Sequence, residues 1–401
     1  MKSKKLSYNK ILVLFSIIVV LVLMTGCDGD DLPIVLNFSA SPSTINQGGS
    51  STLSWSVSDA DTLTITPDVG TVASSGSTSV SPGVTTTYTL IATNSAGSTA
   101  ASVTVNVQAL PVHNLTKGTY YNTIQAALND ADSNDIIEVA DGTYDETICF
   151  PSGKKVILQS VNGPSSTTIR GDDNSSTVNL SNSLPGTTIE GFTITHAVGL
   201  VGGGIFNDVG NLTIYNCTVS GNTATYGGGG IENSGTLTIT GASTVSGNTA
   251  YYHGGGIRNS NSGTLTITGA STISGNSAAS NGGGIENYGT LTITGASTVS
   301  GNTADYGGGI YICSLSTTIT ASTISGNSAV SNSAASNGGG IYIWLSSFIP
   351  TIGGSSNAEK NTICGNYKSG NSPSLDQQIR DSSGDLYDAY KDTNYIYTNC
   401  P

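Results

Sequence analysis

The chain has 401 residues, of which 10% are charged and 6% are aromatic, while 52 are glycine. This length suits two or three domains, and so few charges with so much glycine argue against an ordinary helical enzyme. The formal net charge is −13. We therefore expect no nucleic-acid partner, because phosphate binding requires clustered lysine and arginine side chains.

Residues 1–26 have the pattern of an export signal rather than of a folded domain. Four lysines precede an apolar stretch over 11–23, which is too short to span a bilayer of about 30 Å comfortably. The following Met-Thr-Gly-Cys resembles the lipobox of bacterial lipoproteins, with methionine where leucine is usual. The resemblance implies lipidation of Cys27 and a place in the bacterial cell envelope, at the outer membrane or the cell surface. An ordinary signal peptide that leaves a free cysteine is the alternative, and Asp28 resembles an inner-membrane retention signal.

Five cysteines follow Cys27, and an odd number cannot pair completely within one chain. Export permits disulfides, and we expect Cys364 with Cys400 to clamp the C-terminal tail, with buried thiols as the alternative. No Cys-x-x-Cys motif or Cys/His cluster is present, so the sequence predicts no metal site and no cofactor. The five cysteines are Cys149, Cys217, Cys313, Cys364 and Cys400.

Residues 27–32 form a tether, and 33–108 alternate apolar and polar residues in short runs separated by Gly, Pro and Asn. Short strands at regular spacing around Trp55 predict an all-β sandwich. The run from Tyr88 to Ala92 resembles the Tyr-x-Cys-x-Ala of immunoglobulin-like domains, with Leu90 in place of the cysteine. Such a module implies a spacer, followed by a linker over 109–121.

From residue 122 to 366 the chain repeats itself. Gly-Gly-Gly-Ile, Leu-Thr-Ile and Ser-Gly-Asn recur together, and the isoleucines after the glycines are 25 to 31 residues apart. Self-similarity at this period is the mark of a solenoid. Each unit has three short β-type runs and no helical stretch, so the sequence predicts a right-handed, three-sided parallel β-helix with Ile, Leu and Val inside.

Stacked coils place equivalent residues in vertical columns about 4.8 Å apart, where asparagine amides can hydrogen-bond along the column. We therefore assign the repeated asparagines a structural role, and expect the glycines before each Ile to supply positive φ at a corner. The columns are Asn207, Asn233, Asn259 and Asn287, and Asn222, Asn248, Asn276, Asn302 and Asn327.

The triple-glycine and Ser-Gly-Asn repeats resemble those of polymorphic outer-membrane proteins. The stretch from Asn122 to Leu128 and the run over 136–144 resemble the start of the pectin-lyase-like superfamily. Residues 124–131 have one apolar face, and Asn122 with Gln125 has capping-box spacing, so we expect a short helix that closes the open end of the core. The resemblance implies the fold, and it leaves lyases, hydrolases, esterases and non-catalytic adhesins as possible functions.

No catalytic residues can be assigned from the sequence. The best acid–base cluster is 170–174, Arg-Gly-Asp-Asp-Asn, which is also the pattern of a solvated turn. None of the polygalacturonase motifs is present, and the three histidines form no Ser/His/Asp arrangement. A polysaccharide lyase or glycoside hydrolase that acts on an extracellular polysaccharide is the alternative function.

The residue after each repeat isoleucine forms one outward column. Glu232 and Glu286 are two coils apart, near the separation of an inverting glycosidase pair, but Arg258 between them is expected to keep both ionised. An exposed Glu-Arg-Glu ladder is therefore the simpler interpretation. With Tyr226, Tyr252 and Tyr306 at the preceding corner, the column is our candidate binding face for polysaccharide or a surface protein: Phe206, Glu232, Arg258, Glu286, Tyr311 and Tyr342.

Past Asn366 the repeat fails, and residues 367–401 are assigned to a C-terminal cap with Leu375, Ile379, Leu386 and Tyr390 at loosely helical spacing. The sequence thus predicts a lipid-anchored, non-catalytic protein whose β-helix presents a surface for adhesion or for carbohydrate or protein binding.

Overall fold

The computed structural model describes residues 31–314, 316–330, 338–344, 351–353, 361–364, 366–368, 379–381, 384–385 and 395–397. The chain divides into two units, one built from residues up to 45 with 49–108, the other from 46–48 with 109 onward. No helix among the described residues is long and apolar enough to cross a membrane. Cys27, the predicted lipidation site, lies outside the described residues.

The first unit is a two-sheet antiparallel sandwich. Leu53, Trp55 and Leu90 are buried in its core, and the Trp55 indole donates a hydrogen bond to the carbonyl of Ala73 (2.8 Å). One sheet has the order β1 (Ile34–Ser41), β3 (Ser51–Ser58) and β6 (Ser75–Val80). The other has the order β2 (Thr44–Asn46), β8 (Gly97–Gln108), β7 (Thr86–Asn94), β4 (Thr62–Thr66) and β5 (Gly70–Thr71).

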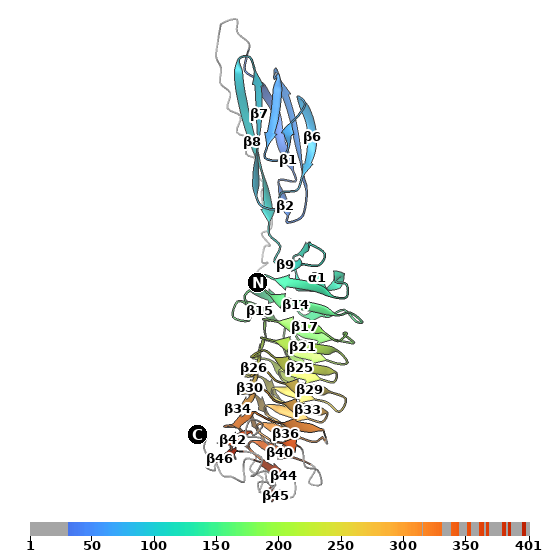
Figure 1. The fold of residues 1–401 in the computed structure, drawn as a ribbon, viewed down its shortest axis with the longest axis vertical. Helices are drawn as coiled ribbons and strands as arrows, with labels where there is room; N and C mark the ends of the chain where they lie inside the picture. Colours follow the sequence, from blue (N-terminus) through green and yellow to red (C-terminus); the bar gives the residue numbers. More distant parts are fainter. Residues whose placement is uncertain are drawn as a thin grey trace, which may run out of the picture. The chain divides into compact units, whose positions relative to one another are not determined.

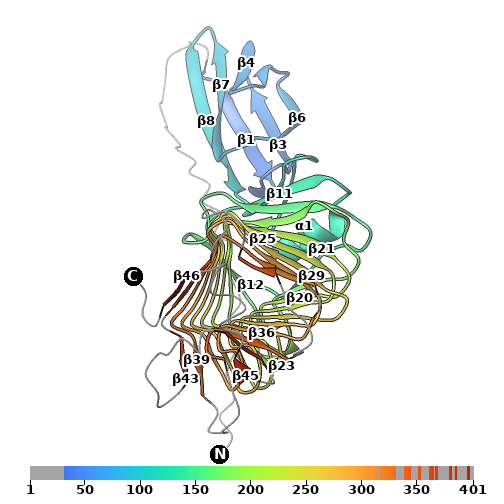
Figure 2. The same cartoon turned by 60° about the horizontal axis from the view of Figure 1, so that its bottom comes forward.

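The second unit is a parallel β-helix, in which successive coils stack strand on strand (Figures 1 and 2). Sheet 1 runs β10 (Thr119–Tyr121), β9 (Val112–Asn114), β11 (Asp135–Val139), β14 (Val156–Ser160), β17 (Thr187–Glu190), β21 (Asn211–Tyr215), β25 (Thr236–Thr240), β29 (Thr264–Ile267), β33 (Thr290–Ile293), β37 (Thr317–Ile319) and β41 (Thr351–Ile352). Sheet 2 runs β12 (Gly142–Asp145), β15 (Thr167–Arg170), β18 (Thr193–Thr195), β22 (Thr218–Ser220), β26 (Thr244–Ser246), β30 (Thr272–Ser274), β34 (Thr298–Ser300), β38 (Thr323–Ser325), β42 (Thr362–Cys364) and β46 (Tyr395–Tyr397).

Sheet 3 carries the repeat isoleucines. It runs β13 (Ile148–Cys149), β16 (Val178–Leu180), β20 (Ile205–Asn207), β24 (Ile231–Asn233), β28 (Ile257–Asn259), β32 (Ile285–Asn287), β36 (Ile310–Ile312), β40 (Ile341–Ile343), β44 (Ile379–Asp381) and β45 (Gly384–Asp385). Ile231, Ile257 and Ile285 are direct register partners with no exposed surface, so equivalent side chains do stack in one interior column.

Three strands per coil are present as expected, and a fourth short strand is added between sheets 2 and 3 from β19 onward. Sheet 4 runs β19 (Val198–Val201), β23 (Thr223–Gly227), β27 (Thr249–Ala250), β31 (Ser277–Ala278), β35 (Thr303–Ala304), β39 (Ser328–Ala329) and β43 (Tyr367–Lys368). The triple glycine follows this strand and turns the chain into sheet 3. The first glycine of a triple has positive φ, as in Gly228 (+64°), whereas a Cβ on Gly229 would lie 2.4 Å from the Gly255 carbonyl oxygen. The first glycine of each triple is therefore required for its positive φ, whereas the second is required because neighbouring coils approach too closely to admit a Cβ.

Two columns of asparagines hold the coils together. Asn207, Asn233 and Asn259 each donate from Nδ2 to the Oδ1 of the asparagine in the next coil, at 2.7 Å. In the second column, each asparagine from Asn222 to Asn327 donates from Nδ2 to the Oδ1 of the asparagine in the next coil, at 2.9–3.0 Å, and the last acceptor is Asn366. All of these side chains are buried.

The helix α1 (Ile124–Asp130) closes the first coil, with Ile124, Leu128 and Ala131 fully buried against the core. Its N-cap is Thr123, whose hydroxyl accepts from the Ala126 amide, so the predicted capping role of Asn122 is wrong by one residue. Gln125 does not close a capping box. Its side chain instead binds the backbone of Cys149 in the first coil, which fixes the helix on the core.

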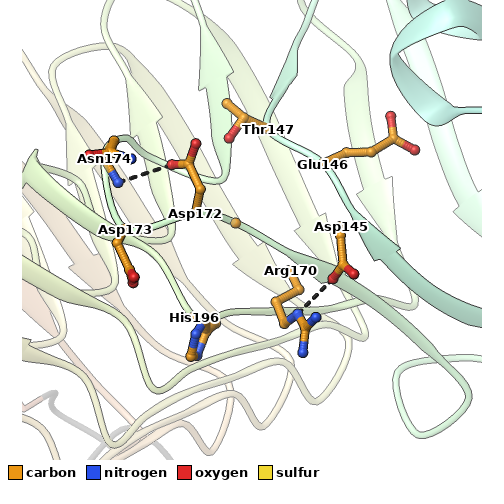
Figure 3. A pocket seen from close by; sticks show the side chains of 9 residues that line it. Asp145, Glu146, Thr147, Arg170, Asp172, Asp173, Asn174 and His196 are labelled. Carbon is orange, nitrogen blue, oxygen red and sulfur yellow. Dashed lines mark hydrogen bonds and ion pairs between the residues drawn. The ribbon is translucent and has the colours of Figure 1, made fainter. Parts of the chain in front are cut away.

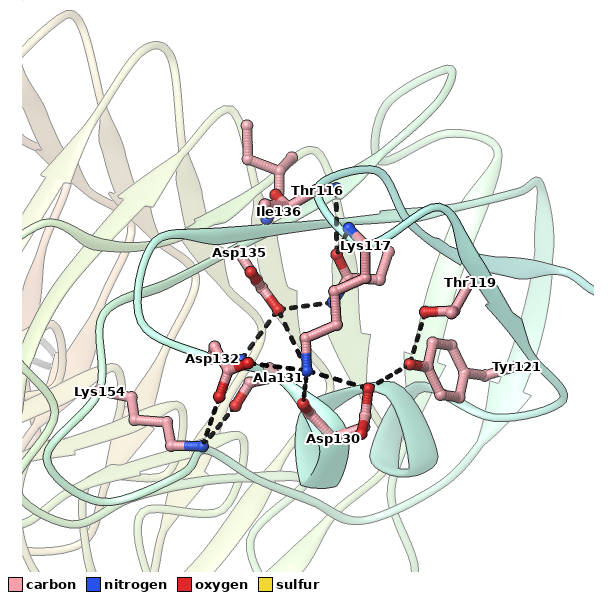
Figure 4. A network of polar contacts seen from close by, with 11 residues as sticks. Thr116, Lys117, Thr119, Tyr121, Asp130, Ala131, Asp132, Asp135, Ile136 and Lys154 are labelled. Carbon is pink, nitrogen blue, oxygen red and sulfur yellow. Dashed lines mark hydrogen bonds and ion pairs between the residues drawn. The ribbon is translucent and has the colours of Figure 1, made fainter.

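Lys117 ties this end of the unit together. Its ammonium group lies 3.1 Å from Asp130, 3.0 Å from Asp132 and 3.9 Å from Asp135 (Figure 4). These contacts raise the pKa of Lys117 and lower the pKa of Asp132. The hydrogen bond from the Tyr121 hydroxyl, and after it the one from Lys117, lowers the pKa of Asp130. The network joins the β9–β10 hairpin to the end of α1. We therefore assign it a structural role in closing the first coil.

The β-helix extends beyond the predicted boundary at 366. β43, β44 and β46 continue sheets 4, 3 and 2 in parallel register. Ile379 lies in β44 rather than in a helix, because backbone pairing with the coil above does not require the glycine motif. Leu375, Leu386 and Tyr390 lie outside the described residues. Cys364 is disulfide-bonded, and Cys400, its predicted partner, also lies outside them.

Candidate functional site

The candidate binding face does not form an exposed column on sheet 3. Phe206 and Arg258 are half-buried. The other four side chains retain little exposed surface: Glu232 3%, Glu286 0%, Tyr311 5% and Tyr342 4%. The predicted exposed Glu-Arg-Glu ladder is therefore wrong, since both carboxylates are buried.

The corner between sheets 4 and 3 covers this column. Gly227, His253, Asn281 and Tyr306 form isolated parallel bridges from coil to coil at that corner. The Tyr306 ring packs on Tyr342 with centroids 5.4 Å apart. Alternation along a sheet 3 strand places the residue after each repeat isoleucine on the outer side of the sheet. The fourth strand and the glycine turn then cover that side chain.

Beneath this corner lies a group of five polar side chains that we call the carboxylate cluster: Glu232, His253, Arg258, Asn281 and Glu286. Arg258 bridges the two glutamates, with Nη1 2.7 Å from Glu232 Oε1 and Nε 3.2 Å from Glu286 Oε2. Its guanidinium carbon is 5.9 Å from the Tyr288 ring centroid. The arrangement is a buried ion-pair triad. Because the cost of desolvating the charges offsets much of their mutual attraction, the triad fixes the local structure more than it stabilises the fold.

The two glutamates differ in how well they are satisfied. Glu286 Oε1 accepts from the Asn281 amide (3.2 Å) and lies 3.1 Å from His253 Nδ1, outside hydrogen-bond geometry. Glu232 Oε2 is buried without a hydrogen-bond partner. Burial raises the pKa of Glu232 to about 7, against the opposing effect of Arg258. The expectation that Arg258 keeps this carboxyl fully ionised is therefore wrong, because desolvation outweighs the ion pair.

Two members of the cluster reach the corner. Asn281 donates a hydrogen bond to Glu286, His253 lies beside the same carboxylate, and the His253 ring neighbours the exposed side chain of Tyr252. Burial likewise raises the pKa of Tyr288 to about 12 and that of the Cys313 thiol, so neither group is a nucleophile at neutral pH. The cluster has buried charge but little exposure to a substrate, which suits support and not catalysis.

Three exposed aromatic side chains stand at this corner, and we call them the tyrosine corner. Tyr226, Tyr251 and Tyr252 are 57%, 61% and 51% exposed. The rings of Tyr226 and Tyr252, in successive coils, have centroids 5.6 Å apart and an interplanar angle of 31°. Leu200, in the coil before, is also exposed. The sequence predicted Tyr226 and Tyr252 as part of the binding face, but it did not predict Tyr251 or Leu200. It also did not assign His253 and Asn281 a role at this corner, although each of them directly precedes a triple glycine.

A second feature is an open depression of about 550 Å³ at the early coils, lined by the predicted acid–base cluster (Figure 3). Arg170 Nε is 2.6 Å from Asp145 Oδ1, and both side chains are about half exposed or more. Asp172 accepts from the Asn174 amide and the Ser175 hydroxyl, which lowers the pKa of its carboxyl. Glu146 is engaged at the N-terminus of α1, where it accepts from the amides of Ile124 and Gln125. The Asp172 carboxyl is thereby stabilised in its ionised form, which does not favour a general acid at this position.

The described residues include no group of three or more His, Cys, Asp or Glu side chains that could hold a metal ion. Cys217 is fully buried, and burial raises the pKa of its thiol to about 12. Cys149 and Cys313 are free thiols.

Comparisons with known proteins add little. No family model and no curated protein matches the sequence. Two solved structures are similar, both of the pectin methylesterase from Aspergillus niger. The deglycosylated form is 16% identical and covers 71% of this chain and 88% of its own, with a TM-score of 0.34. The penultimately deglycosylated form is 15% identical and covers 72% and 89%, with a TM-score of 0.30. The fold is established by the strand pairing itself.

Proposed function

We propose that the β-helix is a non-catalytic binding module for a neutral polysaccharide, held in the cell envelope by a lipid anchor on Cys27. The observation that carries the proposal is the tyrosine corner, where three aromatic side chains are exposed directly above buried charges. The sandwich over 33–108 then serves as a spacer between the anchor and the module.

Exposed tyrosines suit a sugar polymer because each ring offers an apolar face and a polar hydroxyl. The C–H face of a pyranose ring packs on such an aromatic face, while its hydroxyls bond to neighbouring polar groups. Tyr226 and Tyr252 occupy neighbouring coils, so their rings form a contiguous platform along the stack. Large exposed apolar groups that gather in one place mark an interaction site more often than isolated ones do.

Charge favours a neutral polymer over an acidic one. Between residues 211 and 320 the chain has four charged residues, Glu232, Arg258, Glu286 and Asp305. Two of these are buried carboxylates, and the whole chain has a net charge of −13, which repels polyanions. Among the described side chains at the tyrosine corner, the half-buried Arg258 is the one permanent cation, and both glutamates already engage it.

The alternative is a lyase or hydrolase, and one observation favours it. The depression at Asp145 and Arg170 is large enough for a sugar unit. It brings the carboxylates of Asp145 and Asp172, the guanidinium of Arg170 and the imidazole of His196 to one surface. Against it, the Arg170–Asp145 pair is solvent-exposed, and Asp172 is stabilised as a carboxylate rather than as a proton donor.

Replacing both Tyr226 and Tyr252 by alanine is expected to weaken binding to insoluble neutral glucan or xylan by about tenfold, since each aromatic contact contributes about 0.5–1.5 kcal/mol. Depletion isotherms with the full chain measure the effect. Tyr215→Ala is the matched control, because Tyr215 is an exposed tyrosine on sheet 1 (39%) and its loss should leave binding unchanged. Equal losses in both variants would refute the assignment of the site.

A further inference from the structure

Threonines cover the outer side of sheet 1 in a regular lattice. In β25, Thr236, Thr238 and Thr240 alternate with Leu237 and Ile239, which are fully buried, so all three threonines point outward. The next coils repeat the pattern in direct register. We call these residues the threonine array: Thr236, Thr238, Thr240, Thr264, Thr266, Thr268, Thr290, Thr292, Thr294, Thr318 and Thr320.

The array is periodic in two directions. Strands in a sheet are about 4.8 Å apart, and outward residues along one strand are about 6.7 Å apart. The parallel pairs from β25 to β37 have no register shift, and backbone hydrogen bonds from Thr268, Thr294 and Thr320 extend the pairing past the strand ends.

The chemistry of the array is uniform. Each threonine presents one methyl and one hydroxyl, and branching at Cβ restricts its rotamers, so little side-chain entropy is lost when a ligand orders them. Within the described part of the chain, the one hydroxyl contact inside the array is between Thr320 and Thr294, at 3.4 Å. None of the four charged residues between 211 and 320 lies on sheet 1, since Glu232, Arg258 and Glu286 are on sheet 3 and Asp305 precedes it.

We propose that the threonine array is a binding site for ice. An ice crystal face has a repeat that extends in two dimensions, as the array does. The prism face of hexagonal ice presents water oxygens in a rectangular lattice whose two repeats are close to the two spacings of the array. Methyl groups exclude loosely held water and the free hydroxyls bond to the ordered water layer, whereas a charged surface would keep its own hydration shell.

This inference is independent of the proposed polysaccharide site, because the two surfaces share no residue. We expect a polysaccharide chain to pack on aromatic faces, as at the tyrosine corner. None of the eleven array side chains is aromatic.

The test is partition of the full chain into slowly grown ice, together with inhibition of ice recrystallisation. The wild-type chain is expected to be enriched in the ice and to suppress coarsening of the crystals. The double variant Thr266→Tyr and Thr292→Tyr, which puts two bulky side chains at the centre of the lattice, should lose at least tenfold in the concentration needed for inhibition. Tyrosine is a good strand former at outward positions, so far-UV circular dichroism and the melting temperature should be unchanged.

Thr249→Tyr is the matched control, because Thr249 is an exposed threonine on sheet 4, outside the array. It should behave as wild type, and so should the Tyr226→Ala and Tyr252→Ala variant. Failure of the wild-type chain to enter ice would overturn the proposal, as would equal activity of the array variant. Loss of polysaccharide binding in the array variant without any ice activity would assign the surface to carbohydrate instead.

Discussion

Asn276→Ala is expected to lower the free energy of unfolding by about 3–6 kcal/mol. Asn276 Oδ1 accepts from the backbone amide and the side-chain amide of Asn248, each at 3.0 Å, and its Nδ2 donates to the Val245 carbonyl at 3.0 Å. Alanine would remove all three hydrogen bonds and also the one that Asn276 Nδ2 donates to Asn302 Oδ1 (2.9 Å). Each buried polar group that loses a partner costs about 1–3 kcal/mol. Urea-induced unfolding followed by circular dichroism measures the loss.

Asn261→Ala is the control for this prediction, because Asn261 is exposed in a loop and its removal should change stability by less than about 0.5 kcal/mol. A loss below about 1 kcal/mol for Asn276→Ala would mean that the asparagine columns do not hold the coils together.

Glu232→Gln is expected to remove a component of the pH dependence of stability. Burial raises the pKa of Glu232 from an ordinary 4.5 to about 7. Between these values the native carboxyl is protonated while the unfolded one is ionised, so the native state binds more protons and stability falls as pH rises. The slope is about 1.4 kcal/mol per pH unit, which amounts to roughly 3 kcal/mol across the window.

Glutamine resembles the protonated side chain at every pH. The free energy of unfolding of the variant, relative to wild type, should therefore rise by roughly 3 kcal/mol between pH 4.5 and pH 7.5. Urea titrations at four pH values measure this difference. Asn261→Ala, which removes an exposed side chain that does not titrate, should keep the wild-type pH profile. A constant difference between Glu232→Gln and wild type would show that Glu232 is ionised throughout.

The stacking of equivalent residues could be predicted from the sequence because it depends only on a regular spacing. Once Ile231, Ile257 and Ile285 occupy one interior column, every residue at a fixed offset from them occupies a column too. The asparagine ladders follow for the same reason. The helix at the first coil was also predictable, and only its cap was displaced, because Thr123 and Asn122 are both good capping residues.

The burial of the candidate face could not be predicted in this way. Alternation along β24 correctly places Glu232 on the outer side of the sheet, but its exposure depends on the neighbouring corner. That corner carries the fourth strand and the bridges through His253 and Asn281, which are tertiary features of two to four residues per coil. The end of the β-helix was misjudged likewise, since β44 and β46 pair without the repeat motif.

Binding of a polysaccharide without cleavage is tested by incubating the full chain with a panel of neutral and acidic polysaccharides, with and without calcium. Both the bound fraction and the chain length of the recovered polymer are then determined. We expect retention on neutral polymers, weak retention on acidic ones, and no change in chain length. Shortened polymer, or retention confined to acidic polymers, would refute the proposed function.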